Sequence, residues 1–323
     1  YPDRVGQRRP GTQGRYLLSN GRGAAFAAAN SLARSDYIVA AALDDRDREA
    51  RIDLAVPVSA EVLERVLGER IVTQESCGWD AAASAVLWQR QRRLGAIVLE
   101  QQQHAPPESD DTLAAMLAGV RALGLAALPW NDEARMLQAR LQFVGVLAQA
   151  ALPGRPELTG WPASDDVTLS ETIDDWLPAW LAGVTRREQL ARVPLAEALR
   201  TRLSSAQQRA LEALAPRELP MPTGSRARID YLDANAPCVS VRLQELFGQS
   251  ETPRIGGGTV PVTFKLLSPA QRPLQITRDL ASFWRSSYAE VRKEMRGRYP
   301  KHVWPENPLE ARPTRATGRP RRR

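Results

Sequence analysis

The sequence predicts a multidomain α+β protein, and three observations support this prediction. The 323 residues are enough for two or three domains of ordinary size. Hydrophobic residues make up 43% of the chain and charged residues 25%, which is typical of globular proteins. The apolar pattern changes along the chain from short strand-like runs to helical spacing and back to strands. We therefore expect an N-terminal β-barrel, an α-helical middle, and a C-terminal antiparallel α+β domain with a long basic helix.

The first hundred residues predict a small barrel. Residues 1–13 are rich in Arg and Gly, so we expect them to be the tail of a preceding domain or a linker. Residues 14–105 carry several strand-like runs and one short helix, which is typical of an OB-type β-barrel and fits other small β-barrels equally. We expect strands at residues 16–19, 37–43, 51–58, 71–76, 85–92 and 96–100, a helix at 59–67, a charged hairpin loop at 44–49 and a turn at 78–80.

Helical spacing dominates residues 106–216. A Pro-containing linker precedes this region, and Asn131 is a good helix N-cap because its side chain can accept a hydrogen bond from a free backbone N–H group. Asp165-Asp166 and Asp174-Asp175 lie near expected helix N-termini, where negative charge is favourable without any catalytic role. The expected helices cover residues 111–123, 130–150, 170–181, 187–192, 195–202 and 205–214.

Residues 217–308 predict an antiparallel α+β domain that ends in one long helix. Strand-like runs cover residues 221–231, 238–243, 260–267 and 274–277, and Asp279 is a good N-cap for the helix that follows. Arg285, Arg292 and Arg296 fall on a stripe of this helix, with Lys293 at its margin. Beside that stripe lies an apolar one that should face the core, formed by Leu280, Phe283, Trp284, Val291 and Met295.

Positive charge is concentrated at the C-terminal end. Residues 276–323 hold 13 basic and five acidic side chains, a balance of +8, whereas the whole chain carries +7. A basic end on a near-neutral body indicates a polyanionic partner, most simply nucleic acid, although many charged helix faces are only solvated. Residues 309–323 should form a disordered basic tail. The candidate nucleic-acid contacts here are Arg285, Arg292, Lys293, Arg296, Arg298 and Lys301.

A second group of candidate contacts lies in the expected barrel. OB-type domains bind single strands through a positive groove and stacking rings. Arg90, Arg92 and Arg93 form a dense basic point, and Arg15 and Arg22 lie near the first expected turn. The rings of Tyr16, Trp79 and Trp88 would stack on bases. In the alternative interpretation, Trp79 and Trp88 are core or cross-strand rings.

Catalytic and metal-binding motifs are missing from this sequence. None of the three lysines follows a glycine, so the chain has no phosphate-binding loop of the Walker type. Cys77 and Cys238 suit a reducing compartment better than a disulfide framework, and two histidines show no metal-ligand spacing. We expect no catalytic residue, no metal, no cofactor and no membrane-spanning segment here. Because the chain opens at Tyr1, we expect it to be a piece of a longer protein.

Several segments closely resemble the C-terminal domain of bacterial HrpB helicases, which are ATP-dependent RNA helicases of the DEAH/RHA type. They are TGSRARIDY at 223–231, VRLQELFG at 241–248, LLSPAQRPLQITRDLASFW at 266–284 and SYAEVRKEMRGRYPKH at 287–302. LPWNDEARMLQARLQFV at 128–144 resembles the helical segment that precedes that domain. Residues 14–100 resemble the family's OB-type domain more weakly, and residues 1–9 the end of the helical domain before it. Val303 departs from the family pattern, where many relatives have Pro.

The resemblance implies an accessory region of a cytoplasmic helicase. The family's motor consists of two RecA-like domains that hold ATP and Mg²⁺, and none of its catalytic motifs has a matching position in this chain. The leading hypothesis is therefore a region that binds single-stranded RNA or DNA beside the RecA domains of the parent chain. The alternative is a protein-interaction module that docks a partner or the helicase core.

Overall fold

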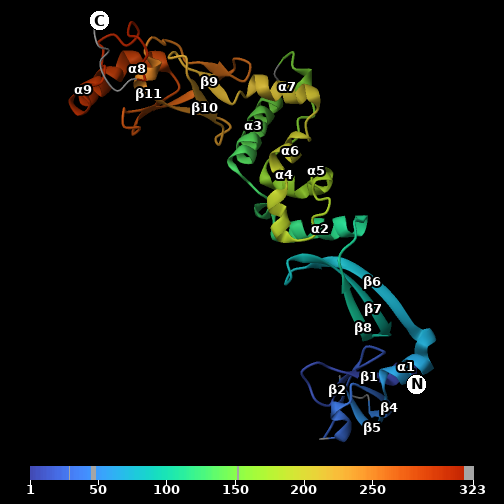
Figure 1. Ribbon diagram of the computed structural model, residues 1–323. Coiled ribbons are helices and arrows are strands. Elements are labelled where there is room, and N and C mark those ends of the chain that lie inside the picture. Colours follow the sequence, from blue (N-terminus) through green and yellow to red (C-terminus); the bar gives the residue numbers. More distant parts are fainter. Residues whose placement is uncertain (29, 45–48, 151–152, 316–323) are drawn as a thin grey trace. The chain divides into compact units, whose positions relative to one another are not determined.

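The computed structural model describes residues 1–28, 30–44, 49–150 and 153–315 (Figure 1). It divides into two compact units, the first formed by Tyr1–Ala122 with Ala182–Gln189 and the second by Leu123–Leu181 with Leu190–Arg323. The first unit is mostly strands and the second combines helices with sheets. The multidomain α+β class predicted from the sequence is therefore confirmed.

The first unit begins with a closed five-stranded barrel in the order β1-β2-β3-β5-β4. β3 and β5 pair in parallel, and the other pairs are antiparallel. We expected residues 1–13 to precede the barrel, but β1 lies among them. A Cβ at Gly6 would lie 3.1 Å from a Leu18 methyl, which is closer than side chains normally pack. Close packing therefore favours glycine at this position of β1, where an alternating strand would otherwise show an apolar side chain. The strands are β1 (Val5–Arg8), β2 (Arg15–Leu18), β3 (Gly23–Phe26), β4 (Tyr37–Asp44) and β5 (Ala50–Pro57).

A separate antiparallel sheet follows, formed by β6 (Ile71–Asp80), β7 (Ala85–Leu94) and β8 (Ile97–His104). We expected these strands to belong to the barrel. They stay outside it because β1 pairs with β4 and so closes the barrel without a free edge. The turn expected at 78–80 is also displaced, since β6 runs through Asp80 and the hairpin turns after it. The hairpin loop expected at 44–49 falls largely on 45–48, outside the described residues.

Both ends of this sheet are anchored in the first unit. At one end Leu94 and Ile97 pack with Val5 and Leu63, the last from helix α1 (Ala60–Leu67). The Gln7 side chain donates to Val98 O at 2.7 Å and accepts from Val98 N at 3.3 Å. At the other end Trp79 lies so close to Gly119 of α2 (Asp110–Leu123) that a Cβ there would overlap the indole ring.

The second unit begins with a group of helices. Asn131 caps α3 through its bond to Ala134 N at 2.9 Å, as the sequence predicts. The helix expected at 170–181 is broken instead, because Thr172 leaves helical geometry and Pro178 starts a separate short turn. The helices are α3 (Asp132–Gln149), α4 (Asp166–Glu171), α5 (Ile173–Trp176), α6 (Leu195–Arg200) and α7 (Ser205–Leu214).

The sheet of the second unit has the order β15-β14-β11-β10-β9 and is mixed rather than antiparallel. β11 and β14 pair in parallel, from Cys238 opposite Thr263 to Arg242 opposite Leu267. The expectation of an antiparallel domain is therefore wrong. Some twenty residues separate the two strands, which is the length a parallel crossover needs. The strands are β9 (Glu218–Pro220), β10 (Arg226–Asp230), β11 (Cys238–Arg242), β14 (Thr263–Leu267) and β15 (Pro273–Thr277), and β12 (Arg254–Ile255) pairs separately with β13 (Val260–Pro261).

Two helices replace the single long helix that we expected after residue 276. α8 (Leu280–Ser286) and α9 (Tyr288–Arg298) meet at Ser287. The Ser286 hydroxyl donates to Ser282 O at 2.7 Å, the kind of side-chain bond that competes with helix continuation. The predicted apolar stripe faces the core at four of its five residues, since Leu280, Phe283, Trp284 and Met295 are buried, whereas Val291 is only partly buried.

The chain after α9 returns over the same unit. Tyr288 Oη donates to Pro305 O at 2.8 Å, and Gly248 N donates to Pro308 O at 3.0 Å. Further on, Thr314 N donates to Gln244 O at 3.0 Å. We expected a disordered tail from residue 309. Instead, residues 309–315 are held by the backbone bond of Thr314 and by the ion pair of Arg315 with Glu245 at 3.3 Å, and residues 316–323 lie outside the described residues.

The helices within the described ranges include none with the length and apolar character required to cross a membrane.

Candidate nucleic-acid interface

The α8 and α9 cations divide into free and partnered side chains. Arg285, Lys293 and Arg296 are exposed, and within the described residues none of them forms an ion pair. Lys293 and Arg296 line a shallow groove together with Ala289, Arg292 and Gly297, because residues three and four apart share one helix face. This groove therefore offers two uncompensated cations to an anionic ligand.

Arg292 has a structural role that the sequence pattern did not reveal. Its Nε donates to Trp304 O at 3.1 Å, and its NH2 lies 2.9 Å from Glu306 Oε1. Only 24% of its side chain is exposed. Arg292 thus holds the returning segment against α9, and its guanidinium is less available to a ligand than those of its two neighbours.

The remaining C-terminal candidates lie at the end of α9 and beyond it. Arg298 pairs with Glu294 at 3.2 Å across one helical turn, and Lys301 is exposed. His302 packs edge-on against Tyr299, with ring centroids 6.0 Å apart. Burial lowers the pKa of His302, and the positive charge of Arg242 lowers it further. His302 therefore favours the neutral form near neutral pH and adds little charge to this surface.

The three arginines of β7 do not form one basic point. Successive side chains of a strand point to opposite faces, so Arg90 and Arg92 share one face and Arg93 lies on the other. Arg92 pairs with Glu64 at 2.5 Å and Glu100 at 3.6 Å, and Arg93 donates to Ala96 O at 3.3 Å. Arg90 is the exposed member of the three.

The candidates near the barrel divide into exposed arginines and rings that are buried or packed. Arg15 and Arg22 are exposed, and Arg15 lies 3.9 Å from Glu49. Tyr16 is fully buried in the barrel core, where its hydroxyl lies 2.6 Å from Leu32 O, so it is a core ring and no stacking surface. Trp79 packs on Gly119. Trp88 is half-buried on the central strand β7, where it pairs with Cys77 of β6 on one side and His104 of β8 on the other.

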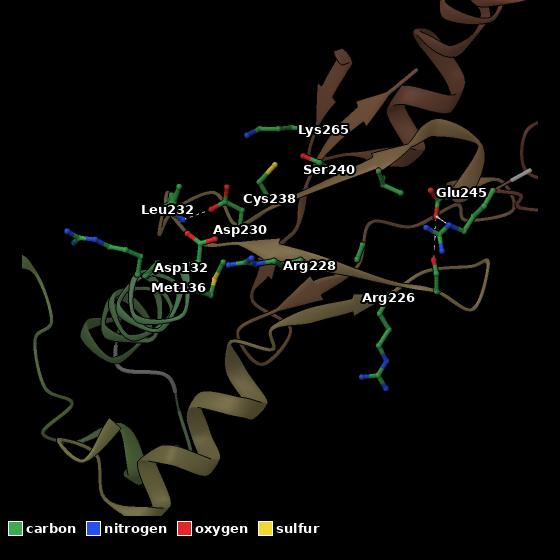
Figure 2. Close-up of a pocket in the computed structure, with 16 residues that line it drawn as sticks. Asp132, Met136, Arg226, Arg228, Asp230, Leu232, Cys238, Ser240, Glu245 and Lys265 are labelled. Atoms are coloured by element: carbon green, nitrogen blue, oxygen red, sulfur yellow. Dashed lines mark hydrogen bonds and ion pairs between the residues drawn. The ribbon is translucent and has the colours of Figure 1, made fainter. Parts of the chain in front are cut away.

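A pocket that the sequence analysis missed lies in the second unit, between α3 and the sheet (Figure 2). Its volume is about 710 Å³, and its lining comes from the N-terminal half of α3 and from β10, β11 and β14. Arg228, Ser240 and Lys265 stand on its sheet side, while Asp132 and Met136 come from α3. The sequence does contain a signal for this surface. Arg226 and Arg228 alternate with Ala227 and the buried Ile229, which is typical of a strand with one basic, solvent-facing side.

Possible metal ligands and thiols complete the description of the polar side chains. Within the described ranges no group of three or more His, Cys, Asp or Glu side chains is placed to hold a metal ion. Cys77 and Cys238 are both free thiols. Burial raises the pKa of the Cys238 thiol, an effect that nearby Lys265 only partly offsets, so this cysteine remains a protonated, unreactive group.

Comparison with known proteins identifies relatives of this chain. A family model described as "ATP-dependent helicase C-terminal" matches residues 176–308. The ATP-dependent RNA helicase HrpB of Escherichia coli strain K12 is 40% identical over 319 residues, covering 98% of this chain. The chain spans 38% of the length of that relative.

Two solved structures are also similar. The crystal structure of the E. coli DExH-box NTPase HrpB has a TM-score of 0.62 and 38% identity, covering 98% of this chain and 38% of that one. A crystal structure of the E. coli DEAH/RHA helicase HrpB has a TM-score of 0.52 and 37% identity, covering 94% and 37%. The resemblance to HrpB-type DEAH/RHA helicases that the sequence motifs predict is therefore confirmed along almost the whole of this chain.

Proposed function

We propose that this chain is a nucleic-acid-binding accessory region of an ATP-dependent RNA helicase. The observation that carries the proposal is the α9 groove, where Lys293 and Arg296 are exposed without an anionic partner among the described residues. Two cations on one helix face suit successive phosphates of a single strand, and binding would release the counterions condensed on that strand.

The barrel would make the second contact. A closed five-stranded barrel with one parallel pair supports an OB-type domain, a class that binds single strands in a positive groove. Of the candidate cations in this unit, Arg15, Arg22 and Arg90 are exposed. In the parent protein, which would act in the cytoplasm, ATP and Mg²⁺ would be held by RecA-type motor domains next to this region. RNA or DNA leaving those domains would then reach the barrel and the α9 groove.

The test is a fluorescence titration of the chain with labelled single-stranded RNA at 50 mM and 200 mM salt. Each phosphate contact on a single strand contributes about 0.7 to the salt slope, so three contacts would weaken binding by roughly 10–20-fold across this range. Lys293→Ala with Arg296→Ala should lower the slope by about 1.4. Arg209→Ala with Arg272→Ala removes the same charge from exposed positions elsewhere and should leave the slope nearly unchanged.

Absence of salt-dependent binding by the unaltered chain would refute this proposal and favour docking to a protein. One feature supports such docking, because Leu54 and Val56 on one side of β5 are 59% and 58% exposed. Apolar side chains held in water at adjacent outward positions are typical of an interface. In that case Leu54→Ser with Val56→Ser would abolish binding to the isolated motor domains.

A further inference from the structure

One row of side chains crosses the outer face of the sheet in the second unit. The strand register places Ser240 opposite Lys265 and Lys265 opposite Ile276. On the other side, Ile229 pairs with Val239 and Asp230 with Cys238, and continuing this register by one residue places Arg228 opposite Ser240. Arg228, Ser240 and Lys265 therefore stand side by side on three neighbouring strands, and all three are exposed. We call them the sheet-face row.

The two cations of the sheet-face row form no ion pair with any residue that the structure describes. Neither Arg228 nor Lys265 lies within 4.0 Å of a carboxylate oxygen among the described residues, whereas nearby Arg226 pairs with Glu218 at 3.8 Å. Adjacent strands lie about 4.8 Å apart, so the two cationic residues are separated by roughly 10 Å at the backbone with a hydroxyl between them. Both side chains are long enough to reach over Ser240 from opposite sides.

The chemistry of the row fits one phosphate group. A guanidinium offers a planar pair of donors to phosphate oxygens, an ammonium offers a compact positive charge, and a hydroxyl offers one more donor. Figure 2 shows Lys265, Ser240 and Arg228 on the sheet side of the pocket. The volume of about 710 Å³ is sufficient for a nucleotide unit rather than a free ion alone.

Carboxylates border the row without occupying it. Asp132 belongs to α3, and Asp230 stands two residues along β10 from Arg228 on the same strand face, where it accepts a hydrogen bond from Leu232 N at 2.9 Å (Figure 2). Glu245 is already neutralised by Arg315 at 3.3 Å. Asp132 would repel a phosphate from α3 and Asp230 would repel it from the end of the row near Cys238, so the position above Ser240, between Arg228 and Lys265, is the most favourable one.

We propose that the sheet-face row binds a phosphodiester group in the backbone of single-stranded nucleic acid. This inference rests on the proposed function, since it adds a second contact surface to a region that binds a single strand. The site lies on β10, β11 and β14, so its residues can be changed without touching the α9 groove.

The experiment compares four forms of the full chain in the same titration with labelled single-stranded RNA. Arg228→Ala with Lys265→Ala should lower the salt slope by about 1.4 and weaken binding by about tenfold near 100 mM salt. Ser240→Glu should weaken binding at least as much, because a carboxylate between the cations pairs with both and repels phosphate. All three positions are exposed, so these variants should keep the unfolding midpoint of the unaltered chain. Arg209→Ala with Arg272→Ala is the control of equal charge.

Failure of the inference and failure of the proposed function give different results. If the unaltered chain shows no salt-dependent binding, the proposed function is wrong and the site has no ligand of this class. If the unaltered chain binds, but the Arg228 and Lys265 variant behaves like the charge-matched control, the sheet-face row is no phosphate site. Retention of full affinity by Ser240→Glu would overturn the inference on its own.

Discussion

Arg140 shows how a single charged residue organises the second unit. It is 1% exposed, and its Nε donates to Ala215 O at 2.6 Å while its NH2 lies 2.7 Å from Glu212 Oε2. The guanidinium thus satisfies a backbone carbonyl just beyond α7 and completes the end of that helix. Glu212 is 56% exposed, so the charge is paired at the edge of the interior rather than in the middle of it.

Replacing Arg140 should therefore be costly. We expect Arg140→Ala to lower the free energy of unfolding by roughly 3 kcal/mol, because it leaves a cavity and an unsatisfied buried carbonyl. Arg209 is an exposed arginine of α7, and Arg209→Ala should change the free energy of unfolding by less than about 0.5 kcal/mol. Urea denaturation followed by tryptophan fluorescence measures both. Equal effects of the two substitutions would mean that the Arg140 bonds contribute nothing net to stability.

At the scale of elements, α8 and α9 combine a packed side and a charged side. Trp284 is 8% exposed and donates from Nε1 to Gln249 O at 2.8 Å. It also packs with Phe247, Phe283 and Tyr288, at ring-centroid distances of 4.9–6.2 Å. We expect Trp284→Ala to cost about 3–5 kcal/mol in thermal or urea unfolding. A cost below 1 kcal/mol would contradict the assignment of this side to the core.

Arg292 and Arg296 lie one turn apart on α9 and should respond in opposite ways. Arg292→Ala removes the bonds to Trp304 O and Glu306, so hydrogen exchange of the backbone across residues 303–308 should become faster. Arg296→Ala should leave that exchange unchanged and weaken nucleic-acid binding instead. The interpretation of Arg292 as a positioning residue fails if its substitution leaves exchange in the returning segment unaltered.

Elements with strong local signals were predictable from the sequence. The capping box of Ser204 and Gln207 begins α7 at the expected residue, and the Asn131 cap does the same for α3 within two residues. β1 was not predictable, since Gly6 and Arg8 hide its alternation. Parallel pairing of β11 with β14 was not predictable either, because it depends on contacts between distant segments. Helical spacing placed Arg292, Lys293 and Arg296 near one another, but it could not show that Arg292 is partnered and the other two are not. The sheet-face row required the strand register.

At the scale of the whole molecule, we expect this chain to bind no ATP. The sequence has no Gly-Lys-Ser/Thr motif to cradle the phosphates of ATP. Calorimetry with ATP and Mg²⁺ should therefore give no micromolar isotherm, even where single-stranded RNA binds. A clear micromolar isotherm would show that the chain holds a nucleotide site of another kind.

The connectivity of the two units limits how the molecule can be divided. The chain leaves the first unit after Ala122, returns for Ala182–Gln189 and leaves again. The returning stretch is part of the first unit's structure, since Val86 N donates to Thr185 O at 2.7 Å and Arg187 N to Ser84 O at 3.0 Å. A cut between Gly154 and Arg155 would consequently give two polypeptides that remain associated, because each contributes to both units. Neither unit is therefore one continuous stretch of sequence, so no single cut of the backbone can separate the first unit from the second.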